Sequence, residues 1–235
     1  MVFLWLFFLV LPAFAGDEVN DDLFEDYVQT GEEESGVPDP LYHFNHAMYT
    51  FNDRLYFWAL KPAARGYGYI IPRPVRTCVK NVFDNLLFPV RFVNSIFQGK
   101  ARGAGSELKI FAVNSTVGLL GLFRPAQEKF QWKSSPEDLG QTLGSYKLKE
   151  GFYLVLPFLG PSTLRDLVGT IGDSFVTPIS YVTPYEAALG IRAFDILNST
   201  SLRIGDYEAL KRASLDPYVA IKDGYIQLRR KKVLQ

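Results

Sequence analysis

The two histidines of the chain, His43 and His46, are the side chains whose type and spacing first suggest chemistry. They lie one helical turn apart, and Asp39 and Asp53 fall on the same side of a helix drawn through them. Imidazole and carboxylate groups of this kind bind transition metals. However, one helix would supply all four groups, and their spacing does not make them converge. We therefore expect a solvated polar face here, with no metal and no cofactor.

The sequence contains no pattern typical of covalent or acid–base catalysis. It has no G-x-S-x-G elbow, no S-x-x-K with its companion motifs and no Gly-rich phosphate loop. Ser162 fits the N-cap of a helix. The pairs Arg165-Asp166 and Glu137-Asp138 fit helix-surface charges or ion pairs better than an acid and a base. We therefore predict that the protein is not an enzyme.

The histidines belong to the first clear helix, which we predict to begin with Asp39 as N-cap and Pro40 as the first helical residue. Its apolar residues recur every three or four positions in one stripe: Leu41, Phe44, Met48, Phe51, Leu55 and Trp58. Three tyrosines border the stripe beside Asn45 and Asn52, as in an interfacial belt: Tyr42, Tyr49 and Tyr56.

The rest of the chain predicts a mainly α fold with a single domain. Proline and glycine divide residues 61–74 into short pieces. Helices are predicted near 75–86, 89–98, 101–119, 135–144, 161–172, 185–198, up to 213, and from Asp216-Pro217 to the basic run 229–232. Within the apolar run 152–159, Pro157 argues against a central strand. The many glycines favour close approach of helices.

The composition indicates apolar surface beyond what a compact core requires. Hydrophobic residues make up 48% of the 235 residues and aromatic residues 15%, yet no stretch of 18 apolar residues occurs. The sequence therefore predicts no ordinary transmembrane helix. An apolar surface without a spanning helix favours contact with lipid.

Charge is distributed unevenly along the chain. Residues 16–39 contain ten acidic side chains and no lysine or arginine, so residues 16–38 are predicted to be a disordered acidic linker. All 25 basic residues follow from Arg54 onward, against the 15 remaining acidic ones, which leaves the body at +10. A basic body suits an anionic membrane surface. No nucleic-acid-binding module is recognisable, so no nucleic-acid partner is expected.

Residues 1–15 are predicted to be a signal peptide. An apolar run ends in Ala13-Phe14-Ala15, a small-x-small cleavage site. No basic residue precedes Arg54, which is unusual for a signal peptide and leaves a short N-terminal anchor as the alternative interpretation.

With these segments in place, residues 39–233 resemble the VacJ/MlaA family of outer-membrane phospholipid-transport proteins. The resemblance lies in several separated motifs. They include Asp39-Pro40-Leu41, Phe44-Asn45, Phe51-Asn52-Asp53, Leu60-Lys61-Pro62, Gln98-Gly99-Lys100, Val113-Asn114-Ser115-Thr116, the run from Glu137-Asp138 to Leu143-Gly144, Tyr153-Leu154-Val155-Leu156-Pro157, Leu164-Arg165-Asp166 and Leu215-Asp216-Pro217-Tyr218.

The resemblance implies a ring of amphipathic helices that lies in the periplasmic leaflet of the outer membrane around a lipid passage. It implies removal of mislocalised phospholipid from the outer leaflet, transfer to a periplasmic lipid carrier, and association with a trimeric porin. On this basis we expect the passage and its gating to involve Phe44, Asn45, Met48, Leu156, Phe158 and Leu159.

One departure from the family concerns attachment. Many members carry a lipidated cysteine directly after the signal, whereas Gly16 follows Ala15 here and the only cysteine is Cys78. We therefore expect the ring itself to hold the protein in the membrane after export. The alternative function is a non-transporting envelope scaffold or interaction protein, and an enzyme acting on lipid is a more distant third.

Overall fold

The structure is a computed structural model in which residues 36–235 are described. The predicted signal peptide and nearly all of the predicted acidic linker lie outside the described residues. The chain runs through α3 (Tyr42–Leu55), the π-helical η1 (Tyr56–Leu60), α4 (Lys61–Ile70), α5 (Arg73–Leu86), α6 (Phe88–Phe97), α7 (Ala101–Thr116), α8 (Pro125–Glu128), α9 (Leu139–Ser145), β1 (Tyr153–Leu156), β2 (Gly160–Thr163), α10 (Leu164–Ser174), the 3-10 helix η2 (Pro178–Tyr181), α11 (Tyr185–Leu202), α12 (Asp206–Ala213) and α13 (Pro217–Leu234). The predicted fold class, mainly α with a single domain, is confirmed.

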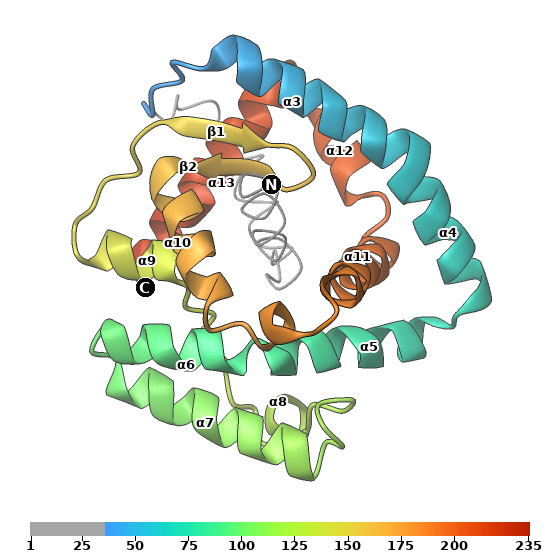
Figure 1. The fold of residues 1–235 in the computed structure, drawn as a ribbon, viewed down its shortest axis with the longest axis vertical. Coiled ribbons are helices and arrows are strands. Elements are labelled where there is room, and N and C mark those ends of the chain that lie inside the picture. The colour runs from blue at the N-terminus through green and yellow to red at the C-terminus, as the bar shows by residue number, and fades with distance from the viewer. Residues whose placement is uncertain (1–35) are drawn as a thin grey trace.

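The elements follow one another around a ring (Figure 1). One side consists of α3, η1 and α4, and the next consists of α5 and α6. Helix α7 packs along α6, whereas α11 packs against both α4 and α5. The ring is completed by α9, α10 and the β1–β2 hairpin, with α12 and α13 leading back toward α3. Each part of the ring therefore touches neighbours that are distant in sequence.

The helix from Tyr42 to Ile70 is continuous, which corrects the prediction of short pieces from residue 61 onward. Pro62 lacks the N–H that an α-helix would use, and its ring crowds the preceding turn. The chain widens into one π-helical turn just before it, where the Lys61 N–H bonds to the Tyr56 carbonyl. This wider turn makes room for Pro62 without breaking the helix.

Three helices begin later than the sequence predicted, because residues expected at their starts make other contacts. Helix α3 begins at Tyr42 without a side-chain cap, and Asp39 instead accepts hydrogen bonds from Asn45 (2.7 Å) and Tyr218 (2.5 Å). The segment predicted to start at Ser135 begins at Leu139, with Asp138 as N-cap. The start predicted at Pro161-Ser162 is likewise wrong, since those residues form strand β2 and α10 begins after Thr163.

Other predicted features of the sequence are confirmed. Asp216 caps α13, where it accepts hydrogen bonds from the backbone N–H groups of Tyr218 and Val219. The apolar run 152–159 contains no central strand: β1 ends directly before Pro157 and pairs only with β2, with Tyr153 opposite Thr163 and Leu156 opposite Gly160. Pro157 thus lies in the turn of the hairpin, where its missing N–H costs no ladder bond.

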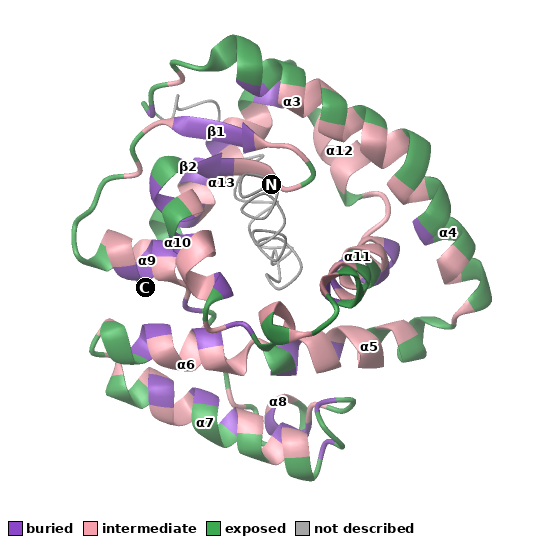
Figure 2. Cartoon of the chain, viewed as in Figure 1, coloured by how far each residue is buried: buried purple, intermediate pink, exposed green. Residues whose placement is uncertain are grey.

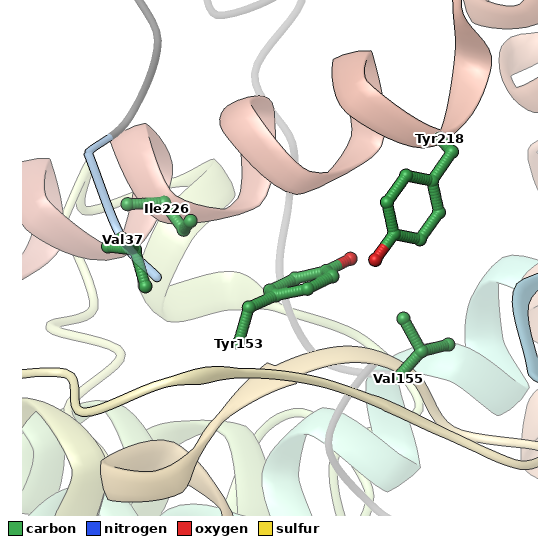
Figure 3. Packing of buried hydrophobic residues seen from close by; sticks show 5 residues of the cluster. All are labelled: Val37, Tyr153, Val155, Tyr218 and Ile226. Atoms are coloured by element: carbon green, nitrogen blue, oxygen red, sulfur yellow. The ribbon is translucent and has the colours of Figure 1, made fainter. Parts of the chain in front are cut away.

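The apolar core cluster is small and joins the start of the described chain to its end. Val37, Tyr153, Val155, Tyr218 and Ile226 pack together between β1 and α13 (Figure 3). Val37 is 6% exposed, and the neighbouring Pro38 carbonyl accepts a hydrogen bond from the Tyr153 N–H at 3.0 Å. Val37, two residues before the predicted domain boundary, is therefore part of the core.

Polarity is inverted relative to an ordinary soluble domain. Among residues 36–235, buried polar and charged residues outnumber buried hydrophobic ones, and many large apolar side chains are exposed. Figure 2 shows exposed positions along α3, α4 and α7. Buried polar groups and contiguous exposed apolar surface are the informative departures from normal burial. No helix in this described part combines the length and apolar character needed to cross a membrane.

We predict that Val37→Ala lowers the free energy of unfolding by about 2 kcal/mol, because it removes two methyl groups and leaves a cavity. Chemical denaturation in detergent measures this change. Val75→Ala is the control, since Val75 is exposed. Equal, negligible effects of the two substitutions would contradict the placement of Val37 in the core.

Candidate functional site

Two asparagines of α3 hold the β1–β2 hairpin against the helix. The Asn45 amide donates to the Tyr153 carbonyl (3.0 Å), and its oxygen accepts from the Val155 N–H (2.8 Å). Two turns later, the Asn52 amide donates to the Leu156 carbonyl (2.8 Å) and accepts from the Phe158 N–H (2.7 Å). Because an amide both donates and accepts, each asparagine satisfies two backbone groups of the hairpin.

The asparagine line determines which face of α3 points outward. Asn45 is fully buried, whereas Leu41, Phe44, Phe51 and Trp58 of the apolar stripe are exposed. The predicted tyrosine belt is wrong for two of its three members. Tyr49 packs against the core cluster and Tyr56 donates to Glu208 (3.0 Å), so only Tyr42 is exposed.

The structure brings together most, but not all, of the predicted passage residues. Asn45 contacts the hairpin directly, and Met48 packs against the core cluster beneath it. Leu156 ends β1, and Leu159 lies in the hairpin turn beside Phe158, which is exposed with its ring 5.2 Å from that of Phe51. Phe44 is exposed on the apolar stripe of α3.

The four groups of the possible metal set have other surroundings. Asp39 binds Asn45 and Tyr218, while Asp53 accepts from Tyr207 (2.8 Å) and Lys211 (2.7 Å). The His46 ring lies 5.5 Å from that of Tyr218. Within residues 36–235, no three histidine, cysteine or carboxylate side chains are grouped to hold a metal ion.

A buried ion-pair cluster around Arg229 joins α13 to α9 and α10. The guanidinium donates to both oxygens of Asp138 (2.5 and 2.8 Å) and to both oxygens of Asp166 (3.1 Å each). Tyr225 also donates to Asp166 (2.8 Å), and Arg165 forms an ion pair with the same carboxylate (3.0 Å). Burial alone would raise the pKa of Asp138, but Arg229 and the hydrogen bonds to Gln141 lower this pKa to about 2.

This cluster resolves an interpretation that the sequence left open. The Arg165-Asp166 and Glu137-Asp138 pairs were predicted to be helix-surface charges or ion pairs, and Arg165 and Asp166 form an ion pair at 3.0 Å. All of these groups except Asp138 are buried residues, and Asp138 is held by Arg229. The spacing of Tyr218, Tyr225 and Arg229, at i, i+7 and i+11, was the available signal that Arg229 shares the inward face of α13.

A second polar cluster lies next to the first. It also includes residues of the family-like run from Glu137 to Gly144. Glu137 accepts from Gln98 (2.8 Å) and Lys100 (2.7 Å) of the α6–α7 corner. The Thr142 hydroxyl donates to Asn94 (2.8 Å), which in turn donates to Asp173 (2.8 Å). Burial raises the pKa of Asp173 to about 7, against the lowering effect of the Leu139 N–H and with the nearby Asp138 charge adding to the rise.

Glycines permit the close approach of α9 and α10, as the sequence suggested. A Cβ at Gly169 would stand 2.4 Å from the Gly140 nitrogen, and one at Gly172 would stand 2.2 Å from the Leu139 side chain. A Cβ at Gly140 would stand 2.5 Å from the Arg229 guanidinium. Larger residues at these positions would separate the helices that the ion pairs join.

Fold and site define a class of mainly helical proteins with buried polar clusters and many exposed large apolar side chains. Within this class, the chain belongs to the MlaA lipoprotein family, whose model matches residues 37–232, and the resemblance predicted from the sequence is confirmed. It is 32% identical to the intermembrane phospholipid transport system lipoprotein MlaA of Escherichia coli (strain K12), over 84% of this chain and 79% of that protein. It is 29% identical to the protein of the same name from Haemophilus influenzae, over 83% of this chain and 79% of that protein. A solved structure from work on maintenance of bacterial outer membrane lipid asymmetry superposes with a TM-score of 0.73 at 30% identity, covering 83% of this chain and 99% of that one.

We predict that Asn45→Ala destabilises the fold strongly, because it leaves two buried backbone groups of β1 without partners, at about 1–3 kcal/mol each. Asn52→Ala should cost less, since Asn52 is only half-buried. Thermal unfolding of the two variants in detergent checks the order. Asn45→Asp is the matched variant: it can still accept from Val155 but cannot donate to Tyr153. A larger loss from Asn52→Ala than from Asn45→Ala would contradict this account.

We predict that ionisation of Asp173 lowers stability as pH rises. Its pKa rises from an ordinary 3.8 to about 7 on folding, so the folded state favours the protonated form. This contribution is fully present below pH 3.8 and is lost as pH rises through 7. Denaturation between pH 4 and 8 should therefore show a smaller decline for Asp173→Asn, which mimics the protonated acid, than for the wild type. Parallel curves would contradict the prediction.

Proposed function

We propose that this protein removes mislocalised phospholipid from the outer leaflet of the outer membrane and passes it to a periplasmic lipid carrier, and so maintains lipid asymmetry. The observation that carries the proposal is the inverted polarity of the described chain, with apolar side chains outside and ion pairs inside. Membership of a family whose relatives are named for intermembrane phospholipid transport supports the substrate class.

The ring is proposed to lie in the periplasmic leaflet, with the lipid passage through it. The outward stripe of α3 supports this position because burial in lipid removes apolar surface from water. About 1000 Å² of such surface is worth up to about 25 kcal/mol, whereas one acyl chain gives only marginal binding. Attachment by the ring itself is therefore physically sufficient.

The hairpin junction is proposed to gate the passage. It comprises Asn45 and Asn52 on α3 with the turn that carries Leu156, Phe158 and Leu159, and Phe44 and Met48 complete the predicted set. The support is mechanical: two amides hold the hairpin to the helix, and the ring of Phe158 contacts that of Phe51. Movement of this turn would expose or cover apolar side chains beside the stripe.

Partners and chemistry follow from the same proposal. A trimeric porin and a periplasmic carrier are the proposed protein partners. No bond chemistry is proposed, because the carboxylates that pair with Arg229, Asp138 and Asp166, are committed to structural contacts. Turnover of labelled phospholipid by the purified protein would contradict this point.

Deleting Phe44 and Asn45 together tests the gate. The deletion rotates the residues upstream by about 200° relative to α3 and removes the amide that binds β1. We expect the protein to insert but to misdirect phospholipid, which is measured as outer-leaflet phospholipid and detergent sensitivity in a strain lacking the native gene. The double substitution Phe44→Ala with Asn45→Ala is the control, because it keeps the helical register.

A phenotype of the deletion identical to that of the strain without the protein would reduce this part of the helix to a structural role. Lipid content of the purified wild-type protein tests the function more broadly. Co-purified phospholipid is expected, whereas a monodisperse, lipid-free soluble protein would favour the scaffold interpretation.

A further inference from the structure

The inward face of η1 and α4 is fixed by contacts with α11 and α12. Tyr56 donates to Glu208 (3.0 Å), Lys61 forms an ion pair with the same carboxylate, and Tyr67 donates to Asn198 (3.0 Å). Ala64 on this face is fully buried. The rotation of the helix about its axis is therefore determined, and so is its outward face.

The outward face alternates arginine with large aromatic residues. Arg54, Trp58, Arg65 and Tyr69 are all exposed along this part of the helix. Trp58 is 78% exposed and Tyr69 is 93% exposed. Arg73 follows at the corner where α4 turns into α5, and it is exposed as well.

The cations on this face have no anionic partner among the described residues. Arg54, Arg65 and Arg73 form no ion pair there, although Arg91, Arg165 and Arg229 all do. The sequence from Arg54 to Phe83 contains no aspartate or glutamate at all. An exposed face that concentrates positive charge and excludes negative charge is complementary to an anionic surface.

The preceding helix segment differs in character. From Gly36 to Asp53 the sequence contains no lysine or arginine, and the exposed stripe of α3 is apolar. An arginine in hydrocarbon costs about 2.5–3.5 kcal/mol, while tryptophan and tyrosine favour the headgroup region. One continuous helix thus presents a hydrocarbon-compatible half followed by a headgroup-compatible half.

We propose that the outward face of the chain from the last turn of α3 through η1 and α4 to the first residue of α5 binds the phosphate groups of anionic phospholipids. Arg54, Arg65 and Arg73 would contact the phosphates, with Trp58 and Tyr69 at headgroup depth. The helix from Tyr42 to Ile70 then lies tilted in the leaflet, with Phe44 deeper than Trp58. This inference rests on the proposed membrane location and adds a lipid class and a depth to it.

Depth is tested with single-tryptophan versions of the full chain in which Trp5 and Trp132 are replaced by Phe. One version keeps Trp58, and the other combines Trp58→Phe with Phe44→Trp. In vesicles containing lipids brominated at different acyl positions, position 44 should be quenched most by deep bromines and position 58 by shallow ones. Equal depth at the two positions would overturn the tilt.

Charge is tested with Arg54→Gln, Arg65→Gln and Arg73→Gln combined. Binding to phosphatidylglycerol-containing vesicles should weaken about 100-fold, corresponding to about 1 kcal/mol for each arginine. Binding to phosphatidylcholine vesicles should change little. The matched control combines Lys129→Gln, Lys133→Gln and Lys147→Gln, which removes the same charge from other exposed positions.

The outcomes separate this inference from the proposed function. If neither tryptophan position is quenched in any vesicle, the membrane location itself fails. If both are quenched but the arginine variant binds anionic vesicles like the wild type, the headgroup site is overturned and the membrane location stands. An equal loss in the lysine control would assign the effect to net charge and would also overturn the site.

Discussion

The contacts of Arg229 with Asp138 and Asp166 are the interaction on which the closure of the ring depends. They join the C-terminal helix α13 to α9 and α10, and both oxygens of each carboxylate accept a hydrogen bond from the guanidinium. Breaking one partner of such a buried cluster typically costs about 3–5 kcal/mol, because it leaves an uncompensated charge. A lysine could not replace this arginine, since a single ammonium cannot present the planar fork that reaches two carboxylates.

The proposed membrane location accounts for the polar interior. Helices that face lipid gain little from burying apolar side chains against each other, because hydrocarbon is as apolar as leucine. Association then relies on hydrogen bonds and close packing, which here are the two polar clusters and the glycine contacts between α9 and α10. The small apolar cluster around Tyr153 and Ile226 lies where the hairpin meets α13.

Local sequence signals predicted the helices well and their starts less well. Helix α13 and its Asp216 cap, and the absence of a central strand at Pro157, follow from capping and proline rules that involve only neighbours in sequence. Asp39 also resembles a cap, yet it binds Tyr218, which lies 179 residues away. The inward role of Asn45 was not predictable for the same reason: its partners belong to a hairpin that the sequence did not reveal.

The site shows the same division between local and long-range information. The family-like motifs identified Phe44-Asn45 and Glu137-Asp138 as important. Only the fold shows that Asn45 holds the hairpin and that Asp138 belongs to the Arg229 ion-pair cluster. These two assemblies share α13: Asp39 links Asn45 to Tyr218, and Tyr225 on the same helix binds Asp166. Asn45 is fully buried and couples the base of the hairpin to these assemblies, whereas Phe158 in the turn is exposed. Motion at the junction is therefore expected to be confined to the turn, because displacing the base would require breaking contacts that also support the closure of the ring.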